Sequence, residues 1–247
     1  MQGEKKRRKK KKKFGYYLYA VVILVLTITN ITLAFLLLTH VQNIQVSGNE
    51  ISQKNEIIAW VREDKLTNNS IYTYWKFKSG SYQMPIYLEE VKVSLGAPWK
   101  VNVKVREKQM IGSMIDGNEY IYFDAEGLVM KRTTEYDASV PVIEGLNVDN
   151  TDQFSYLEVD NEKVFSYIVS ITGEIEKRDL HPDRLVWEEG SMNLYFRDVC
   201  VKLGKSNFGK KVVELPPILS QLEGKKGTLH MEHYTSGRIS FKENTEE

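Results

Sequence analysis

The feature that most constrains this chain is an uncharged apolar stretch that follows a block of basic residues near the N-terminus. Nine consecutive Lys and Arg residues run from Lys5 to Lys13, and residues 16–38 then carry no charge. A helix needs roughly 20 apolar residues to cross the hydrocarbon core of a bilayer. The sequence therefore predicts a transmembrane helix at 16–39, and the basic tail at 1–15 predicts that the N-terminus is cytoplasmic.

We expect this segment to be a permanent anchor rather than a cleaved signal. A cleaved signal has an apolar stretch of about 7–15 residues and ends at a small-residue cleavage site. The stretch here is longer, and the sequence Thr-His-Val-Gln-Asn at 39–43 contains no such site. Within the span, Thr27, Asn30 and Ala34 share one helical face. That face either contacts a partner helix or simply tolerates isolated polar residues.

Charge and cysteine content limit the functions open to the rest of the chain. Without the nine basic residues of the tail, 25 basic residues remain against 33 acidic ones, so the remainder is mildly acidic. Nucleic-acid binding needs clustered Lys and Arg and is not expected. The tail itself is suited to the anionic lipid of the inner membrane. The single cysteine, Cys200, excludes an intramolecular disulfide and is predicted to be a small core residue.

The first unit beyond the span, residues 40–108, is predicted to be a compact α+β domain. Its expected elements are a strand at 41–49, helices at 53–63 and 71–77, and strands at 91–95, preceded by 86–90, and at 101–107. Alternating apolar residues indicate the strands, and an apolar helical face indicates the first helix. The aromatic segment 71–77 could also be a strand. The order strand–helix–helix–strand–strand places helices on one face of a sheet.

The second unit, residues 109–243, is predicted to be a mixed β domain with flanking helices, followed by a short tail at 244–247. Its strands are expected at 120–129 (two strands around an acidic turn), 185–187, 192–196, 199–203, 227–231 and 238–241. Its helices are expected at 161–175 and 208–222. The adjacent Pro216 and Pro217 must kink or split the second helix.

Several motifs, in this order along the chain, resemble the bacterial FtsQ/DivIB family of cell-division proteins. The strand motif Ile-x-Val-x-Gly-Asn begins at Ile44, and the strand from Trp99 to Lys108 is similar to a family strand that ends in Glu-Arg. The usual proline after it is replaced by Gln109 and Met110. Further similar positions are Asp124, Gly127 and Val129, Pro141 and Gly145, and Val201, Leu203 and Gly204. The resemblance implies a POTRA domain followed by the β domain of the family.

No pattern of catalytic residues stands out, so we expect neither an enzyme nor a bound cofactor, metal or small-molecule substrate. Of the four histidines, His230 and His233 are close in sequence, but strand geometry sends such a pair to opposite faces. No glycine-rich phosphate loop and no Gly-x-Ser-x-Gly motif is present. The acidic pair Glu188 and Glu189 is typical of a solvated turn rather than an acid/base couple.

The resemblance implies a non-enzymatic divisome scaffold at the septum, a single-pass type II protein of the plasma membrane with extracytoplasmic domains. The implied partners are bitopic coiled-coil proteins of the FtsB/DivIC and FtsL/DivIC types, with septal wall synthases engaged indirectly. The candidate contact residues are Tyr234, Ser236, Gly237, Phe241, Lys210 and Lys211. Core packing of the two aromatic residues, and a solvated helix start for the lysines, are the alternatives. His230 stands where many relatives have Asp.

Strand addition is the mode of binding that the sequence favours. Small α+β units with exposed sheet edges recruit other chains through backbone hydrogen bonds, and the final strand pair is the best candidate edge. A single-span POTRA-type chaperone or sensor of secreted polypeptides is the main alternative, and it predicts promiscuous peptide binding. A membrane-anchored wall hydrolase would need converging acid and base groups, for which no motif is present.

Overall fold

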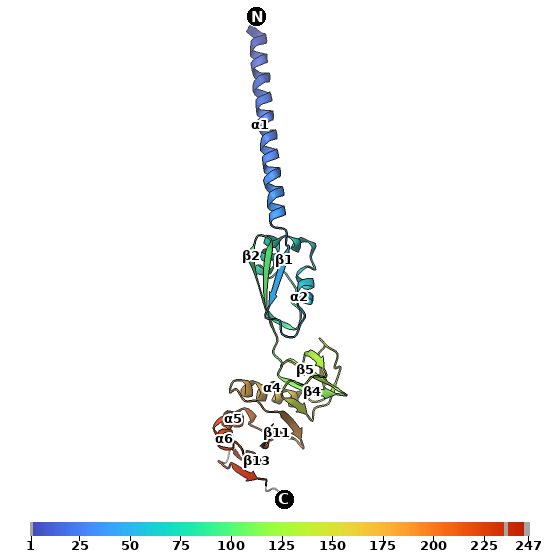
Figure 1. Ribbon diagram of the computed structural model, residues 1–247, viewed down its shortest axis with the longest axis vertical. Helices are drawn as coiled ribbons and strands as arrows, with labels where there is room; N and C mark the ends of the chain where they lie inside the picture. Colours follow the sequence, from blue (N-terminus) through green and yellow to red (C-terminus); the bar gives the residue numbers. More distant parts are fainter. Residues whose placement is uncertain (1, 235–236, 245–247) are drawn as a thin grey trace. The chain divides into compact units, whose positions relative to one another are not determined.

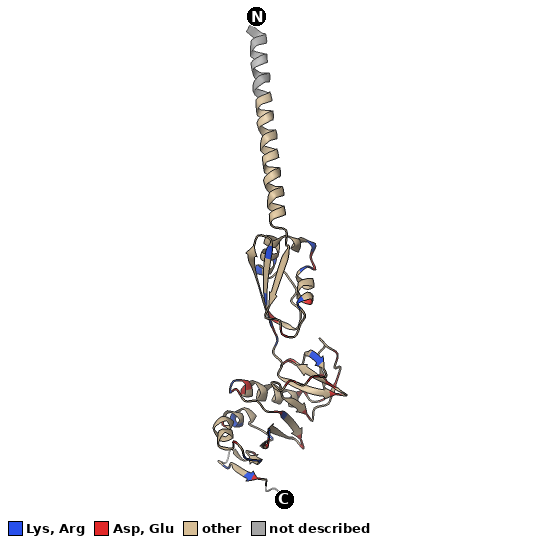
Figure 2. Ribbon diagram, viewed as in Figure 1, with Lys and Arg blue, Asp and Glu red and all other residues tan. Residues whose placement is uncertain are grey.

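The computed structural model describes residues 2–234 and 237–244, with side chains from residue 15 onward. It divides the chain into two compact units, Met1–Glu107 and Lys108–Glu247 (Figure 1). Helix α1 (Gln2–Leu38) opens the first unit, and its segment Gly15–Leu38 is apolar and long enough to span a membrane. Figure 2 shows this segment free of charged residues. The predicted apolar helix is confirmed; its continuation through the basic tail was not predicted.

After α1, the first unit has the predicted order of strands and helices. Its elements are β1 (Asn43–Ser47), α2 (Lys54–Val61), the 3-10 turn η1 (Lys65–Asn68), α3 (Ser70–Lys78), β2 (Leu88–Ala97) and β3 (Lys100–Glu107). The sheet order is β1-β3-β2, with β1 parallel and β2 antiparallel to β3. The segment that could have been a strand is the helix α3, because the Asn69 side chain caps it by accepting from two backbone N–H groups.

Alternation along the strands produces the core of this unit. The inward residues of β1 and β3 meet apolar residues of α2 and α3 in one cluster: Ile44, Val46, Val101, Val103, Val105, Ile57, Val61 and Phe77. Gly48 then ends β1 with a φ of +83°, and a Cβ there would lie 2.2 Å from the backbone oxygen of Val105. The Ile-x-Val-x-Gly motif thus combines two core positions with one close backbone approach.

Glu107 fastens the loop between β1 and α2 to the end of β3. Its carboxylate accepts hydrogen bonds from the backbone N–H groups of Glu50, Ile51 and Ser52 at 2.7–2.8 Å, and from the Ser52 hydroxyl. Burial raises the pKa of Glu107, but these hydrogen bonds outweigh burial, so the pKa lies below its ordinary value of 4.5. This set of hydrogen bonds, the Glu107 clamp, was not predicted from the sequence pattern.

We expect Glu107→Gln to lower the unfolding free energy of the first unit at pH 7 by about 1–3 kcal/mol, the usual value of hydrogen bonds to a charged group. A carboxylate with a lowered folded pKa stabilises the fold above its unfolded pKa, and this contribution is lost as pH falls through the folded pKa. The variant should therefore lose stability less steeply below about pH 4.5. Urea denaturation between pH 7 and pH 3 checks both effects; equal stability at pH 7 would contradict the clamp.

The second unit is built on a nine-stranded sheet in the order β14-β13-β12-β11-β10-β7-β4-β5-β6. Its strands are β4 (Gly112–Asp116), β5 (Glu119–Phe123), β6 (Val129–Thr133), β7 (Val142–Glu144), β10 (Arg184–Glu188), β11 (Ser191–Phe196), β12 (Val199–Gly204), β13 (Gly227–His230) and β14 (Ser240–Glu243). Two short strands, β8 (Val148–Asp149) and β9 (Glu158–Val159), pair separately. All strands expected here are present, and β4, β7, β8 and β9 are additions.

Three helices accompany this sheet: α4 (Glu162–Glu176), α5 (Phe208–Val213) and α6 (Leu215–Gln221). The first two, α4 and α5, pack closely on each other. Of the two predicted outcomes, a kink or a split, the structure shows the split, because α6 begins as a separate helix with Pro216 and Pro217 in its first turn. Apolar residues of α4 and α5, among them Ile168, Ile171 and Val212, join the strands in one core cluster. The helices therefore support the strands that lead to the C-terminal edge (Figure 1).

Candidate partner-binding site at the C-terminal sheet edge

The last strand of the chain is an edge strand of the large sheet. β14 pairs with β13 in antiparallel register, while β13 lies parallel to β12. The opposite edge of the sheet is β6. Among the described residues, no strand pairs with the outer side of β14, so one row of its backbone groups is open to another chain.

The register fixes which backbone groups point outward. The backbone N–H of Asn244 donates to the oxygen of Lys226 at 2.9 Å, which marks these two residues as a hydrogen-bonded pair. Because bonded and non-bonded pairs alternate in an antiparallel ladder, Lys242 and Ser240 also bond to β13. The N–H and C=O groups of Phe241 and Glu243 therefore point to the open side.

The inner neighbour of β13 confirms this alternation. The backbone N–H of Gly227 donates to the oxygen of Asp198, just before β12, at 3.1 Å. The N–H of Met231 donates to the oxygen of Lys202 in β12 at 3.0 Å. Odd-numbered residues at both ends of β13 thus face β12, and the even-numbered residues between them face β14.

Two of the predicted contact residues are aromatic and only partly exposed. Tyr234 and Phe241 are partly buried and pack against the core of the second unit. Burial, together with the neighbouring Glu214, raises the pKa of Tyr234. Gly237 is exposed and its N–H donates to the backbone oxygen of Tyr234 at 2.8 Å in a turn. The fourth predicted residue, Ser236, lies outside the described residues.

The two adjacent lysines of α5 have different environments. Lys210 is exposed, whereas Lys211 is only 2% exposed. The Lys211 ammonium donates to the backbone oxygen of Leu203 and, at 3.5 Å, to that of Glu232, and burial lowers its pKa. Direct partner contact by Lys211 does not fit this position. The side chain instead ties the end of β12 to the segment after β13.

Alanine substitution should separate the two lysines. Lys211→Ala removes the ammonium donor from the buried carbonyl group of Leu203 and the partly buried one of Glu232. We expect it to cost about 2 kcal/mol or more of unfolding free energy. Lys210→Ala should change that free energy by less than about 0.5 kcal/mol. Amide hydrogen exchange of β12 and β13 checks the difference, and unchanged protection in Lys211→Ala would contradict a supporting role for this lysine.

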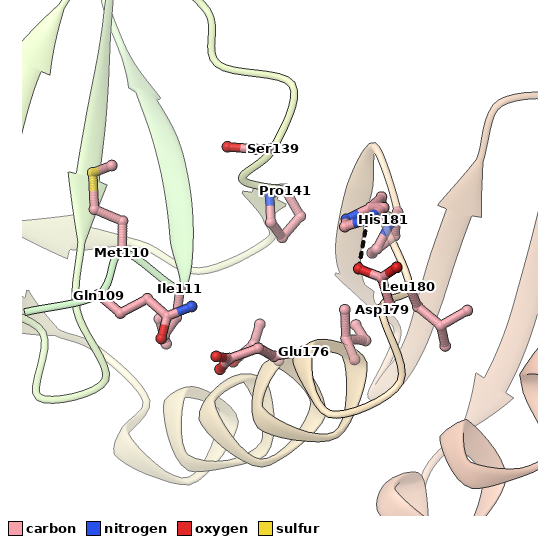
Figure 3. Close-up of a pocket in the computed structure, with 12 residues that line it drawn as sticks. Gln109, Met110, Ile111, Ser139, Pro141, Glu176, Asp179, Leu180 and His181 are labelled. Carbon is pink, nitrogen blue, oxygen red and sulfur yellow. Dashed lines mark ion pairs between the residues drawn. The ribbon is translucent and has the colours of Figure 1, made fainter. Parts of the chain in front are cut away.

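A cavity of about 150 Å³ lies at the start of the second unit, between the chain after Lys108 and the end of α4 (Figure 3). His181 Nε2 is 3.2 Å from Asp179 Oδ1. The Ser139 hydroxyl donates to Asp137 at 2.6 Å, and Figure 3 shows it directed away from His181. These groups do not form a nucleophile and base pair. The sequence pattern did not single out this cavity.

The other titratable groups form no reactive cluster in the part of the chain that the structure describes. No set of three or more His, Cys, Asp or Glu side chains there could hold a metal ion. His230 Nδ1 lies 3.1 Å from Glu232 Oε1. Cys200 is half-buried rather than fully buried, and burial raises the pKa of its thiol, which keeps the thiol protonated near neutral pH.

The polar residues of the membrane-spanning helix bond back to their own helix. The Thr27 hydroxyl donates to Ile23 and the Asn30 amide donates to Leu26, both at 2.8 Å. The helix thereby satisfies part of their hydrogen-bonding capacity without a partner. A contact between the Thr27, Asn30 and Ala34 face and another helix remains a prediction.

Comparison with known proteins gives relatives from cell division. A cell division protein DivIB of Clostridium botulinum is 24% identical over 194 residues, which is 76% of this chain and 75% of that protein. A DivIB protein of Clostridium acetobutylicum is 22% identical over 197 residues, 76% of this chain and 77% of that protein. No family model matches the chain. The solved extracytoplasmic domain of Geobacillus stearothermophilus DivIB aligns at 18% identity with a TM-score of 0.32, covering 47% of this chain and 95% of that domain.

Proposed function

We propose that the chain is a member of the FtsQ/DivIB family of bacterial cell-division proteins, which its DivIB relatives support. We propose further that it is a non-enzymatic scaffold of the divisome. It is a single-pass membrane protein, with Gly15–Leu38 as the span. The basic block before the span supports a cytoplasmic N-terminus, which places both folded units outside the membrane. There the first unit, a POTRA-type domain, helps to recruit the protein to the septum.

The open edge of β14 is the observation that carries the proposal. Phe241 and Glu243 present outward backbone groups, and the Phe241 side chain is partly exposed. An incoming strand gains affinity from the backbone bonds and specificity from side chains that meet this surface. We propose that the occupant is a segment of the FtsB/DivIC–FtsL subcomplex, and that this contact helps to couple it to septal peptidoglycan synthesis.

Purification of the full-length chain from solubilised membranes tests the proposal. The expected product is one stoichiometric complex with a small bitopic coiled-coil protein. A variant that ends at residue 226 lacks β13 and β14 and should lose this complex, while its first unit stays folded. Capture of many unrelated secreted polypeptides would favour the chaperone function instead, and full capture by the truncated variant would rule out the edge.

A further inference from the structure

We propose that the folded domain after α1, residues 40–107 of the first unit, docks on the lipid surface at the end of the span. The side chains of Leu66, Ile71 and Trp99 are then inserted among the headgroups. This inference rests on the proposed membrane anchoring and adds a second contact to it. The folded domain then contacts the lipid headgroups, in addition to the contact that α1 makes with the interior of the bilayer.

The domain is fastened to the end of α1 without a flexible linker. Thr39 follows the last residue of the helix and is only 2% exposed. Its N–H and its hydroxyl both donate to the backbone oxygen of Phe35, at 3.0 and 2.8 Å. Its own backbone oxygen accepts from the Ser70 N–H at 2.8 Å, and its hydroxyl oxygen accepts from the Asn69 amide at 2.7 Å. The start of α3 is therefore bonded directly to the residue that leaves the span.

Two further segments bond to the next residues of the chain. The Val41 N–H donates to the backbone oxygen of Asn68 in η1 at 2.7 Å, and the Gln42 N–H donates to that of Trp99 in the β2–β3 turn at 2.9 Å. An extended residue spans at most about 3.6 Å, so Gln42 lies no more than about 15 Å from Leu38. Because η1, α3 and the turn are held at these residues, all three segments lie at the membrane end of the domain.

The length of the span places this end at the headgroup layer. Gly15–Leu38 contains 24 residues, which make a helix of about 36 Å against a hydrocarbon core of about 30 Å. The Tyr residues at 16, 17 and 19 suit the headgroup layer at the start of the span. The helix then crosses the hydrocarbon core of the bilayer and ends at Leu38, so that Thr39 lies in the headgroup layer on the other side.

Each of the three segments exposes a large apolar side chain. Leu66 of η1 is 61% exposed, Ile71 of α3 is 40% exposed and Trp99 of the turn is 42% exposed. Isolated exposed apolar residues are common on protein surfaces. These three differ because their segments all bond to the residues that follow the span, and Trp in particular favours the membrane interface.

The charged residues of these segments suit an anionic lipid surface. Lys65 is exposed next to Leu66, and Lys100 is half-buried next to Trp99. The negative potential of such a surface attracts both cations. The acidic neighbour Asp64 accepts from the Tyr72 hydroxyl at 2.9 Å and lies 3.5 Å from the Lys76 ammonium. Its charge therefore does little to oppose the approach to anionic lipid.

Fluorescence quenching by spin-labelled lipid tests the docking on the full chain in nanodiscs that contain anionic lipid. In a Cys200→Ser background, a polarity-sensitive dye is placed singly through Leu66→Cys, Ile71→Cys or Trp99→Cys. Glu50→Cys is the control within the same unit, because Glu50 bonds to Glu107 at the far end of β3, roughly 20 Å from Lys100. Leu24→Cys is the control within the span.

We expect the lipid to quench the dyes at the three docking positions severalfold more strongly than the dye at Glu50. With the dye at Ile71, the paired changes Leu66→Ser and Trp99→Ser should reduce the quenching. The reason is that insertion of these two apolar side chains, and not only the short distance from the span, keeps the domain on the lipid surface. The docking would be overturned if quenching at the three positions were no stronger than at Glu50, or if the paired changes left it unaffected. In either case, a quenched dye at Leu24 would show that the helix still spans the membrane. An unquenched Leu24 dye would overturn the anchor and the docking together.

Discussion

Glu243→Pro is expected to lower the affinity for the proposed divisome partner about tenfold or more while the second unit stays folded. The Glu243 N–H points to the open side of β14, so proline removes a donor offered to an incoming strand without breaking a bond to β13. One backbone hydrogen bond contributes about 0.5–1.5 kcal/mol, and about 1.4 kcal/mol is tenfold in affinity. The proline ring also obstructs the approach of the incoming strand.

Two neighbouring variants serve as controls for this prediction. Glu243→Ala keeps the backbone donor and should bind nearly as well as the unmodified chain. Lys242→Pro removes an N–H that bonds inward to β13 at Thr228, so it should destabilise the edge strand itself. Titration of the purified partner segment measures the affinities, and amide hydrogen exchange of β13 reports folding. Equal affinities for Glu243→Pro and Glu243→Ala would contradict binding by strand addition at this edge.

Gly145→Ala is expected to have the largest effect on stability, about 3 kcal/mol or more in the unfolding free energy of the second unit. Gly145 follows β7 with a φ of +85°, and a Cβ there would lie 1.9 Å from the backbone oxygen of Trp187. β7 lies between β10 and β4, so relieving that overlap requires a shift inside the sheet. Both the left-handed backbone and the overlap oppose a side chain.

A second glycine of the same unit provides the matched control. Gly190 has a φ of +74°, but a Cβ there would meet nothing within 4 Å. Gly190→Ala therefore carries only the cost of the left-handed conformation, roughly 1–2 kcal/mol. Urea denaturation of both variants measures the difference. A loss in Gly145→Ala no greater than in Gly190→Ala would show that the close approach to Trp187 does not constrain the fold.

Sequence periodicity predicted the elements that bury a single face. β12 has alternating apolar residues, and its Val199, Val201 and Leu203 are buried. The strand β4 was missed because Gly112, Ser113 and Met114 are all buried. A strand that is covered on both faces has no period-two pattern, so alternation cannot reveal it.

The candidate site was only partly predictable. The last strand pair was recognised as an edge, but which amides point outward depends on the register between β13 and β14, and so short a strand contains no pattern that fixes it. The burial of Lys211, in contrast, could have been predicted from the spacing of its apolar neighbours. Lys211 lies three residues after Phe208 and four before Leu215, both buried, so helical spacing places it on the inward face.

Site-specific photocrosslinking in dividing cells tests the central claim most directly. A photoreactive residue at Glu243 of β14 probes the C-terminal edge, and one at Lys131 of β6 probes the opposite edge of the same sheet. The account predicts that the Glu243 probe captures one small bitopic coiled-coil protein of the FtsB/DivIC type and that the Lys131 probe does not. Absence of that partner at Glu243, or its equal capture from both edges, would contradict a divisome scaffold that binds through its C-terminal strand.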